Sequence, residues 1–183
     1  MHRLTAILLA LSLTQGGLSA ADNQSPYVEY TERPIKALSA EEIDGLRAGR
    51  GMGFALAAEL NGYPGPLHAL EVADAIHLSE SQRERTQTLY REMLDESRNL
   101  GERIVVLEAE LDSAFATRTL TDERLRELTA RIAELNGRVR YTHLRHHLEM
   151  TALLNPHQIE LYNQVRGYGT RDGHARDHHH GDH

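Results

Sequence analysis

The chain contains 183 residues, and its 20 basic against 27 acidic side chains give a formal net charge of −7 at pH 7. This acidic balance argues against nucleic acid as a partner. The lack of cysteine excludes disulfides, thiol chemistry, lipoprotein anchoring and zinc–thiolate sites. Two phenylalanines and no tryptophan leave an aliphatic core, which suits helix packing better than a sheet.

The first 21 residues have the order of a secretory signal peptide. A short basic start precedes an apolar run from Leu4 to Leu13, and small residues follow up to Ala21. The apolar run is shorter than the about 20 residues that a membrane anchor requires, so cleavage after Ala21 is favoured over an uncleaved anchor. We therefore expect an exported, soluble protein, in which residues 22–38 form an N-terminal arm.

Residues 39–168 are predicted to form one helical domain that begins with short helices. A capping box at Ser39, in which two side chains bond free backbone N–H groups, starts the first helix. Four glycines between residues 45 and 53 weaken this helix, which we expect to resume over Met52–Leu60. A further short helix is predicted over Pro66–Ile76, because proline is favoured at the first helical position.

Two long amphipathic segments follow, and their apolar residues recur mostly at steps of three and four. The first helix begins after a capping box of Ser79 and Gln82 and is predicted to span Glu80–Ala116, roughly 50 Å. The return helix begins after the cap Thr121, a short connection later. The apolar positions are Leu89, Met93, Leu100, Ile104, Leu107 and Leu111 in the first helix and Leu125, Leu128, Ile132, Leu135 and Val139 in the second. Such a pair predicts an antiparallel hairpin.

The last predicted helix starts at a third capping box and ends near Gly167. Asn155 is its cap, Pro156 its first residue and Gln158 the partner of the cap. Residues 169–183 are polar and rich in histidine, and we expect them to be disordered. No segment has the alternating pattern of a convincing strand. We therefore predict an all-α fold, in which a long antiparallel helical hairpin carries short flanking helices.

Two segments that precede helices resemble the paired LTXXQ motifs of the Spy/CpxP family. The motif positions are Leu78, Ser79 and Gln82 in the first segment and Leu154, Asn155 and Gln158 in the second. Serine and asparagine replace the threonine of the motif, and both are good helix caps. At the level of helix order, the resemblance covers roughly residues 40–168.

The resemblance to this family implies a periplasmic, curved, helical dimer without enzymatic activity. Some members of the family are ATP-independent chaperones that cradle unfolded clients. Others bind heavy metals, either to buffer them or to inform a signalling partner. Family metal sensors use a His-x3-Met pair on the last long helix, and His146 and Met150 match that spacing.

The predicted return helix carries one cluster of potential metal ligands. Its members are His143, His146, His147 and Met150, which fall within an arc of about 100° on a helix. Imidazole suits Zn, Cu, Ni and Co ions, and a thioether adds preference for softer ions. Further ligands would come from His68, Glu71 and His77. The alternative is that these histidines are hydrogen-bonded in the core or face solvent where the hairpin frays.

The C-terminal tail is a second potential metal-binding segment. Its histidines are His174, His178, His179, His180 and His183. Histidine-rich tracts with interspersed aspartates bind divalent metals loosely through a changing set of ligands. A purification tag or an inert tail is the alternative, although the interruptions in the tract argue against a tag. No metal cofactor is obligatory on this interpretation.

Motifs typical of enzymes are missing from the sequence. It has no G-x-S-x-G, P-loop or H-E-x-x-H motif, and the glycines of residues 49–53 lack the spacing of a dinucleotide-binding fingerprint. We therefore expect a non-enzymatic, periplasmic, heavy-metal-binding stress or sensor protein of the Spy/CpxP family. The alternative is an ATP-independent periplasmic refolding chaperone.

The partners expected from the sequence are other proteins. A lone hairpin leaves helix faces uncovered, so we expect a homodimer, with unfolded periplasmic clients or a membrane signalling partner as further partners. The outer face of the hairpin is rich in arginine and glutamate. This composition fits either a solvated helix surface or a client-binding cradle.

Overall fold

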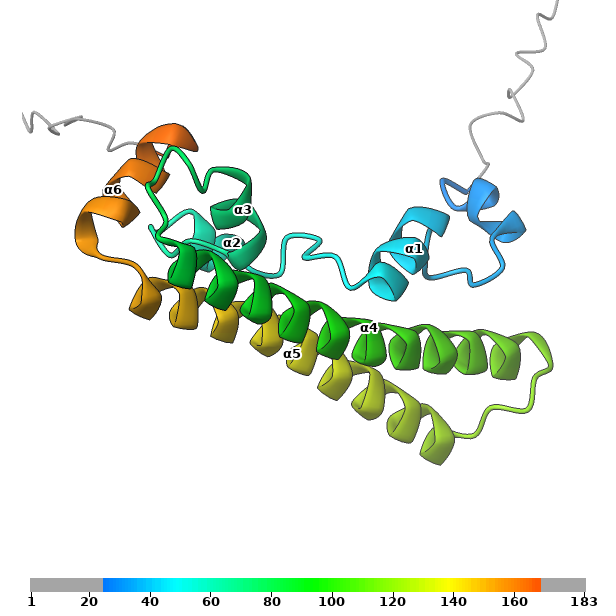
Figure 1. Ribbon diagram of the computed structural model, residues 1–183. Coiled ribbons are helices and arrows are strands. Elements are labelled where there is room, and N and C mark those ends of the chain that lie inside the picture. The colour runs from blue at the N-terminus through cyan, green and yellow to red at the C-terminus, as the bar shows by residue number, and fades with distance from the viewer. Residues whose placement is uncertain (1–24, 169–183) are drawn as a thin grey trace, which may run out of the picture.

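Residues 25–168 are described by the computed structural model, and this part of the chain folds into helices joined by turns (Figure 1). The elements are a 3-10 helix (Val28–Glu32) and the α-helices α1 (Ala40–Ala48), α2 (Leu56–Glu59), α3 (Pro66–Glu71), α4 (Glu80–Ala116), α5 (Asp122–Leu153) and α6 (Pro156–Val165). No strand occurs among these residues, which confirms the all-α prediction for them. The predicted signal peptide and histidine-rich tail lie outside the described residues.

The long helices α4 and α5 lie side by side and run in opposite directions (Figure 1). Close to their connection Arg124 pairs with Glu110, and at the far end Gln82 donates a hydrogen bond to the carbonyl oxygen of Leu153. Helix α4 has the predicted bounds, and α5 begins directly after the predicted cap Thr121. None of the helices within residues 25–168 is long and apolar enough to cross a membrane.

The core consists of two apolar clusters separated by buried polar side chains. The first cluster joins α1 to the halves of α4 and α5 that lie next to their connection. Its members include Leu46, Leu100, Ile104, Leu128 and Val139. The second lies where α3 and α6 cover the other end of the helix pair, and its members include Ala69, Ile76, Leu89, Met150 and Tyr162. Along α4 and α5, the buried residues between the clusters include Ser97, Thr142, His143, His146 and His147. We call these five residues the polar belt.

Helix α1 packs directly on the middle of α4. The contact depends on Gly101, because a Cβ atom at this position would overlap the carbonyl oxygen of Leu46. Helix α1 ends where Gly49 adopts a left-handed conformation with φ of 67°, which glycine tolerates without steric cost. A Cβ at Gly49 would also lie 2.9 Å from the carbonyl oxygen of Leu94, so both glycines permit a close approach to α4.

The helix expected over Met52–Leu60 is present only as the single turn α2. The prediction was wrong for the first residues of this segment, because Met52 and Gly53 have φ angles of 42° and 83°. Positive φ angles at two successive residues are incompatible with a right-handed helix. The chain therefore crosses from α1 to α2 as an irregular loop, which leaves room beside α4.

The helix expected over Pro66–Ile76 ends early, at Glu71. Turns follow up to His77, which has a positive φ of 52°. These turns place Ala73 and Ile76 in the second apolar cluster, where both side chains are buried. Burial of apolar side chains against the neighbouring helices therefore offsets the loss of regular helical hydrogen bonds in this segment.

The two motif segments form complete capping boxes. The Ser79 hydroxyl accepts a hydrogen bond from the backbone N–H of Gln82, and the Gln82 side chain accepts one from the N–H of Ser79. The same pair of bonds joins Asn155 and Gln158 at the start of α6. The sequence prediction of helix starts at both motifs is thereby confirmed.

The two motif glutamines also bond each other across the fold. The Nε2 group of each donates to the Oε1 atom of the other, at 2.9 Å in both directions. Each Nε2 group donates a second bond to the carbonyl oxygen of the residue before the other motif, Leu153 for Gln82 and His77 for Gln158. The motifs are thus one symmetric hydrogen-bonded unit, which we call the glutamine clasp.

Candidate metal centre

The predicted histidines lie on the inner face of α5, but their side chains point to different neighbours. Continuing the register of the Leu128 to Val139 seam places His143, His146, His147 and Met150 toward the interior, and all four are buried. Met150 packs in the second apolar cluster. The three imidazoles lie in the polar belt, where each has a different hydrogen-bond partner.

His143 lies beside α4 and the loop after α1. Its Nε2 atom is 3.3 Å from the hydroxyl oxygen of Ser97, and its ring stacks with Phe54 at an interplanar angle of 14°. Burial, together with the neighbouring His147 and His146, lowers the pKa of His143 to about 4. At neutral pH this imidazole is therefore uncharged.

His146 and His147 are each fixed by a backbone carbonyl. The Nδ1–H of His146 donates to the carbonyl oxygen of Thr142, and that of His147 donates to the carbonyl oxygen of Tyr63, both at 2.7 Å. Because a carbonyl oxygen only accepts, Nδ1 carries the proton and Nε2 of each neutral ring has a free lone pair. A ring held in this way is typical of a metal-binding histidine.

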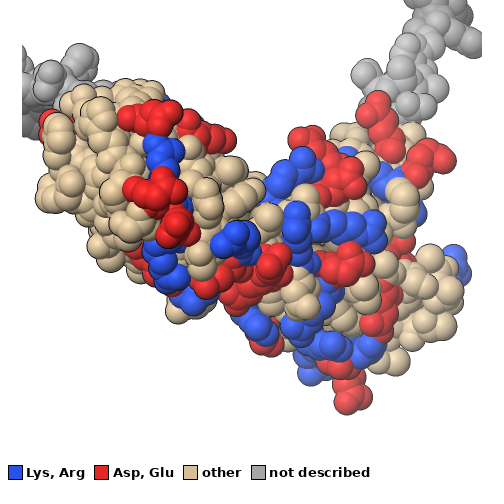
Figure 2. Space-filling model, viewed as in Figure 1, with Lys and Arg blue, Asp and Glu red and all other residues tan. Residues whose placement is uncertain are grey.

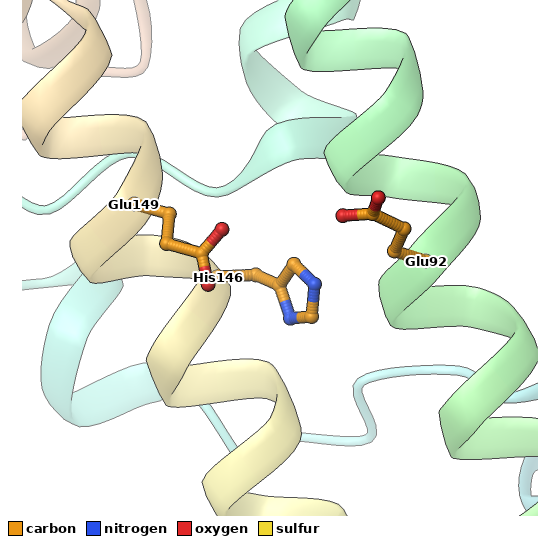
Figure 3. A group of neighbouring side chains, drawn as sticks. All are labelled: Glu92, His146 and Glu149. Carbon is orange, nitrogen blue, oxygen red and sulfur yellow. The ribbon is translucent and has the colours of Figure 1, made fainter.

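His146 lies between two carboxylates, as Figure 3 shows. Glu92 projects from α4 toward α5, and Glu149 is one turn along α5 from the imidazole. One potential ligand atom from each of the three residues lies within 4.8 Å of the other two. His146 is fully buried, and its Nε2 atom has no hydrogen-bond partner among the described residues. Three donors, one of them an imidazole with an unused lone pair, can therefore converge on one cation.

The two carboxylates of this group differ in their surroundings. Glu92 is exposed, and Glu149 is partly buried with its oxygens 3.8 Å from Arg85 and 3.7 Å from Arg145. Ion pairs this long and solvent-accessible contribute little to stability. A cation that displaced the arginines from Glu149 would therefore meet weak competition.

The other predicted donors lie elsewhere in the fold. His68 contacts Glu59, Glu71 pairs with Arg166 at 3.3 Å, and His77 takes part in the glutamine clasp through its carbonyl oxygen. Within residues 25–168, the group of three around His146 does not include them. The five tail histidines, His174, His178, His179, His180 and His183, lie outside the described residues.

A second polar group, which we did not predict, is centred on Glu59. This carboxylate is only 4% exposed and joins four elements of the fold. Its Oε1 atom accepts hydrogen bonds from the Tyr162 hydroxyl and from His68 at 3.2 Å, and Arg166 lies 3.8 Å away. Burial acts to raise the pKa of Glu59, but the hydrogen bonds from His68 and Tyr162 outweigh it, so the net shift is downward. Glu59 is therefore an ionised structural hub.

Neither Glu59 nor Glu92 carries a distinctive signal in the sequence. Glu59 stands at the end of a short, glycine-flanked segment, and Glu92 is one of many acidic residues on the outer part of a long helix. Their partners are 103 and 54 positions away, at Tyr162 and His146. Local patterns therefore could not connect them.

Comparison of the chain with protein-family models, with curated proteins and with solved structures gives no match. The resemblance to the Spy/CpxP family consequently rests on the two motifs and the helix order alone. The ligand groups that the site offers are one imidazole nitrogen and two carboxylates.

Proposed function

We propose that this chain is a periplasmic, non-enzymatic, heavy-metal-binding stress or sensor protein built on a helical hairpin of the Spy/CpxP type. The observation that carries the proposal is the buried, unpartnered Nε2 atom of His146 beside Glu92 and Glu149. Leaving a buried polar atom without a partner costs free energy, and an ion that accepts its lone pair removes this cost. The backbone of Thr142 already holds the ring in the required tautomer.

The donor set indicates which ions would bind. One imidazole nitrogen and two carboxylate oxygens suit divalent Zn, Co or Ni, whereas Cu(I) prefers thioether or thiolate sulfur. Met150, the nearest thioether in sequence, packs among apolar side chains. Three protein donors would leave a coordination position open to water or to a further ligand. We propose a divalent site that holds α4 to α5.

The proposed ion also supplies a signal. Its bonds to Glu149 would release Arg85 and Arg145, which lie next to that carboxylate on the surface of the helix pair. The charge displayed on this surface would therefore change with metal occupancy. A membrane signalling partner could recognise that change, and the histidine-rich tail would serve as a looser store of the same ions.

The test is calorimetric titration of Zn, Co and Ni into the full chain after signal cleavage, with the five tail histidines replaced by asparagine. We expect one site per chain with micromolar or tighter affinity, and about 100-fold weaker binding in His146→Ala because an essential ligand is lost. The exposed residue His157, changed to alanine, is the matched control and should bind as the parent does.

A second variant separates ligand loss from damage to the core. Glu92→Gln combined with Glu149→Gln keeps the size of both side chains near the surface and removes their charge. This variant should fold normally by circular dichroism and lose most of its metal affinity. Unchanged affinity in this variant and in His146→Ala would refute the site.

A chaperone of the Spy type is the second candidate function. Large apolar side chains are exposed along the helix pair, namely Val106, Phe115, Tyr141 and Leu148. On the face shown in Figure 2, basic and acidic side chains are intermixed over α1 and the helix pair. Exposed apolar groups among mixed charges offer an unfolded client both hydrophobic and electrostatic contacts. The same scaffold can carry both functions.

A further inference from the structure

A cavity of about 390 Å³ lies beside the polar belt, at a place that the proposed metal site does not use. It is enclosed by the loop from Ala48 to His68 on one side and by α4 and α5 on the other. Glu92, His146 and Glu149 do not line it. Its volume falls within the range of pockets that hold small organic ligands, about 300–1,000 Å³.

The inner part of the cavity is mainly apolar, and its one acidic member is the buried Glu59. Met93 and Pro66 are buried there, together with the imidazoles of His143 and His147. These side chains give the floor a surface that accepts a hydrocarbon or aromatic group through apolar contact.

Gly65 gives the cavity its shape on the loop side. A Cβ atom at this position would lie 2.8 Å from the Cε1 and Nε2 atoms of His147, so a larger residue would push into the imidazole. The carbonyl oxygen of Tyr63 fixes the same ring from the other nitrogen. The wall is thus held by packing and hydrogen bonds of the chain itself, as expected of a preformed pocket.

The rim of the cavity is apolar and positively charged. Leu56 and Leu67 are exposed there, next to the exposed side chains of Arg50 and Arg98. The acidic residue in the lining, Glu59, is buried, and its Oε1 atom is held by the Tyr162 hydroxyl, with Arg166 3.8 Å away. In a chain with a net charge of −7, two arginines at the mouth of one cavity select for a negative group.

We propose that this cavity binds a small organic anion with an apolar body, such as an alkyl or aryl carboxylate. The apolar body occupies the floor between Met93 and the imidazoles, and the carboxylate lies at the rim with Arg50 and Arg98. Arginine is suited to this role because its guanidinium group forms paired hydrogen bonds with a carboxylate. Arg98 keeps guanidinium donors available, because its ion pair with Asp95 at 3.8 Å is solvent-exposed and its hydrogen bond to the carbonyl oxygen of Ala48, at 3.4 Å, uses only the Nε atom.

The first experiment uses the full mature chain in chelator, with 1-anilinonaphthalene-8-sulfonate as a fluorescent probe and octanoate as competitor. We expect one high-affinity probe site per chain and displacement of the probe by octanoate. Octylamine, which has the same alkyl chain and the opposite charge, should displace it at least about tenfold less effectively. Equal displacement by both compounds, or none by octanoate, would overturn the proposal.

Two variants locate the site. Ala55→Phe fills the cavity and should abolish octanoate binding, whereas Ala57→Phe places the same ring on the exposed side of α2 and should not. Wild-type affinity in a folded Ala55→Phe protein would rule the cavity out. If that variant does not fold, variants of the exposed arginines test the proposal instead.

Arg50→Gln combined with Arg98→Gln should weaken octanoate binding about tenfold, because two charge-assisted contacts are lost. Arg126→Gln with Arg131→Gln is the matched control on a distant exposed face of α5, and it should bind normally. Equal weakening in both double variants would show a general charge effect and refute the assigned rim. The Glu92→Gln, Glu149→Gln protein should bind octanoate normally, which keeps this result independent of metal binding.

Discussion

The buried imidazoles of α5 differ in the direction of their free nitrogen atoms, although they are neighbours on one helix. Thr142 and Tyr63 each accept the Nδ1 proton of one ring, and this fixes which nitrogen keeps a lone pair. The Nε2 lone pair of His146 is consequently left free beside the carboxylates of Glu92 and Glu149, while His147 lies against Gly65 at the cavity. Two adjacent residues thereby belong to two separate proposed sites.

His143 should make the stability of the protein depend on pH. Its folded-state pKa of about 4 lies below the ordinary value of 6.5, so the unfolded chain binds more protons between these values. Stability is therefore full above pH 6.5 and is lost as the pH falls toward 4. From pH 7 to pH 5 the loss from this residue is about 2 kcal/mol.

Urea denaturation at pH 7 and pH 5, in chelator, measures this contribution. His143→Leu should show a smaller loss of unfolding free energy between the two pH values than the parent chain. His157→Leu, on an exposed position of α6, should behave as the parent does. An identical pH dependence in the parent and in His143→Leu would contradict the assignment.

Single residues also show where prediction from the sequence ends. Continuing the apolar register of α5 places His143 and His146 on the inward face and His147 at its edge, and the structure has all three buried. Their partners do not follow, because hydrogen bonds to Ser97 and Tyr63 depend on how distant segments pack. Which of the many acidic residues would face His146 is likewise a property of the packed helices.

Whole elements were more predictable where short-range chemistry defines their ends. Ser39, Ser79, Thr121 and Asn155 each cap a helix through a side-chain bond to a backbone N–H three residues on. Such bonds depend only on neighbouring residues, which is why the sequence located them. The segment before α2 was mispredicted because its left-handed residues and its stacking of Phe54 on His143 depend on tertiary packing.

Two helical glycines in the long helices should respond oppositely to the same substitution. Gly101→Ala places a methyl group against the backbone of Leu46, so α1 must move away from α4. We expect this change to lower the unfolding free energy by about 1–3 kcal/mol, as overpacking does. Gly137→Ala meets no atom within 4 Å and should raise it by about 0.5–1 kcal/mol through helix propensity.

Urea denaturation of the two variants at pH 7 makes this comparison directly. Both proteins should keep the helical circular dichroism spectrum of the parent, because α1 contributes only a small part of the helix content. A Gly101→Ala protein as stable as Gly137→Ala would show that α1 does not dock on α4 as described.

At the scale of the whole molecule, the polar belt separates the two apolar clusters of the core. The clusters could join only if apolar residues replaced the belt. Substituting leucines for the belt would extend one continuous core along the helix pair. The chain instead keeps buried polar groups where the proposed metal site and the cavity lie. Both proposed sites therefore lie where the interior of the helix pair is least apolar.

The chaperone alternative makes a prediction about the intact protein. At stoichiometric amounts and in chelator, the full mature chain should suppress aggregation of a chemically unfolded model protein, measured by light scattering. Replacing Val106, Phe115, Tyr141 and Leu148 by serine should weaken this effect, because the apolar contacts are lost. Replacing the exposed charged residues Glu84, Arg91 and Glu123 by serine is the comparison. No suppression by the parent chain would exclude this function.

The glutamine clasp means that the two motifs cannot change independently. Gln82 and Gln158 share the same two hydrogen bonds, and each also closes the cap of its own helix. Altering either side chain therefore leaves the amide of the other partly unsatisfied in a part-buried position. Which residue is tolerated at one of these positions therefore depends on the residue at the other. Substitutions in one motif consequently limit those in the second motif, although the two glutamines are 76 positions apart in the chain.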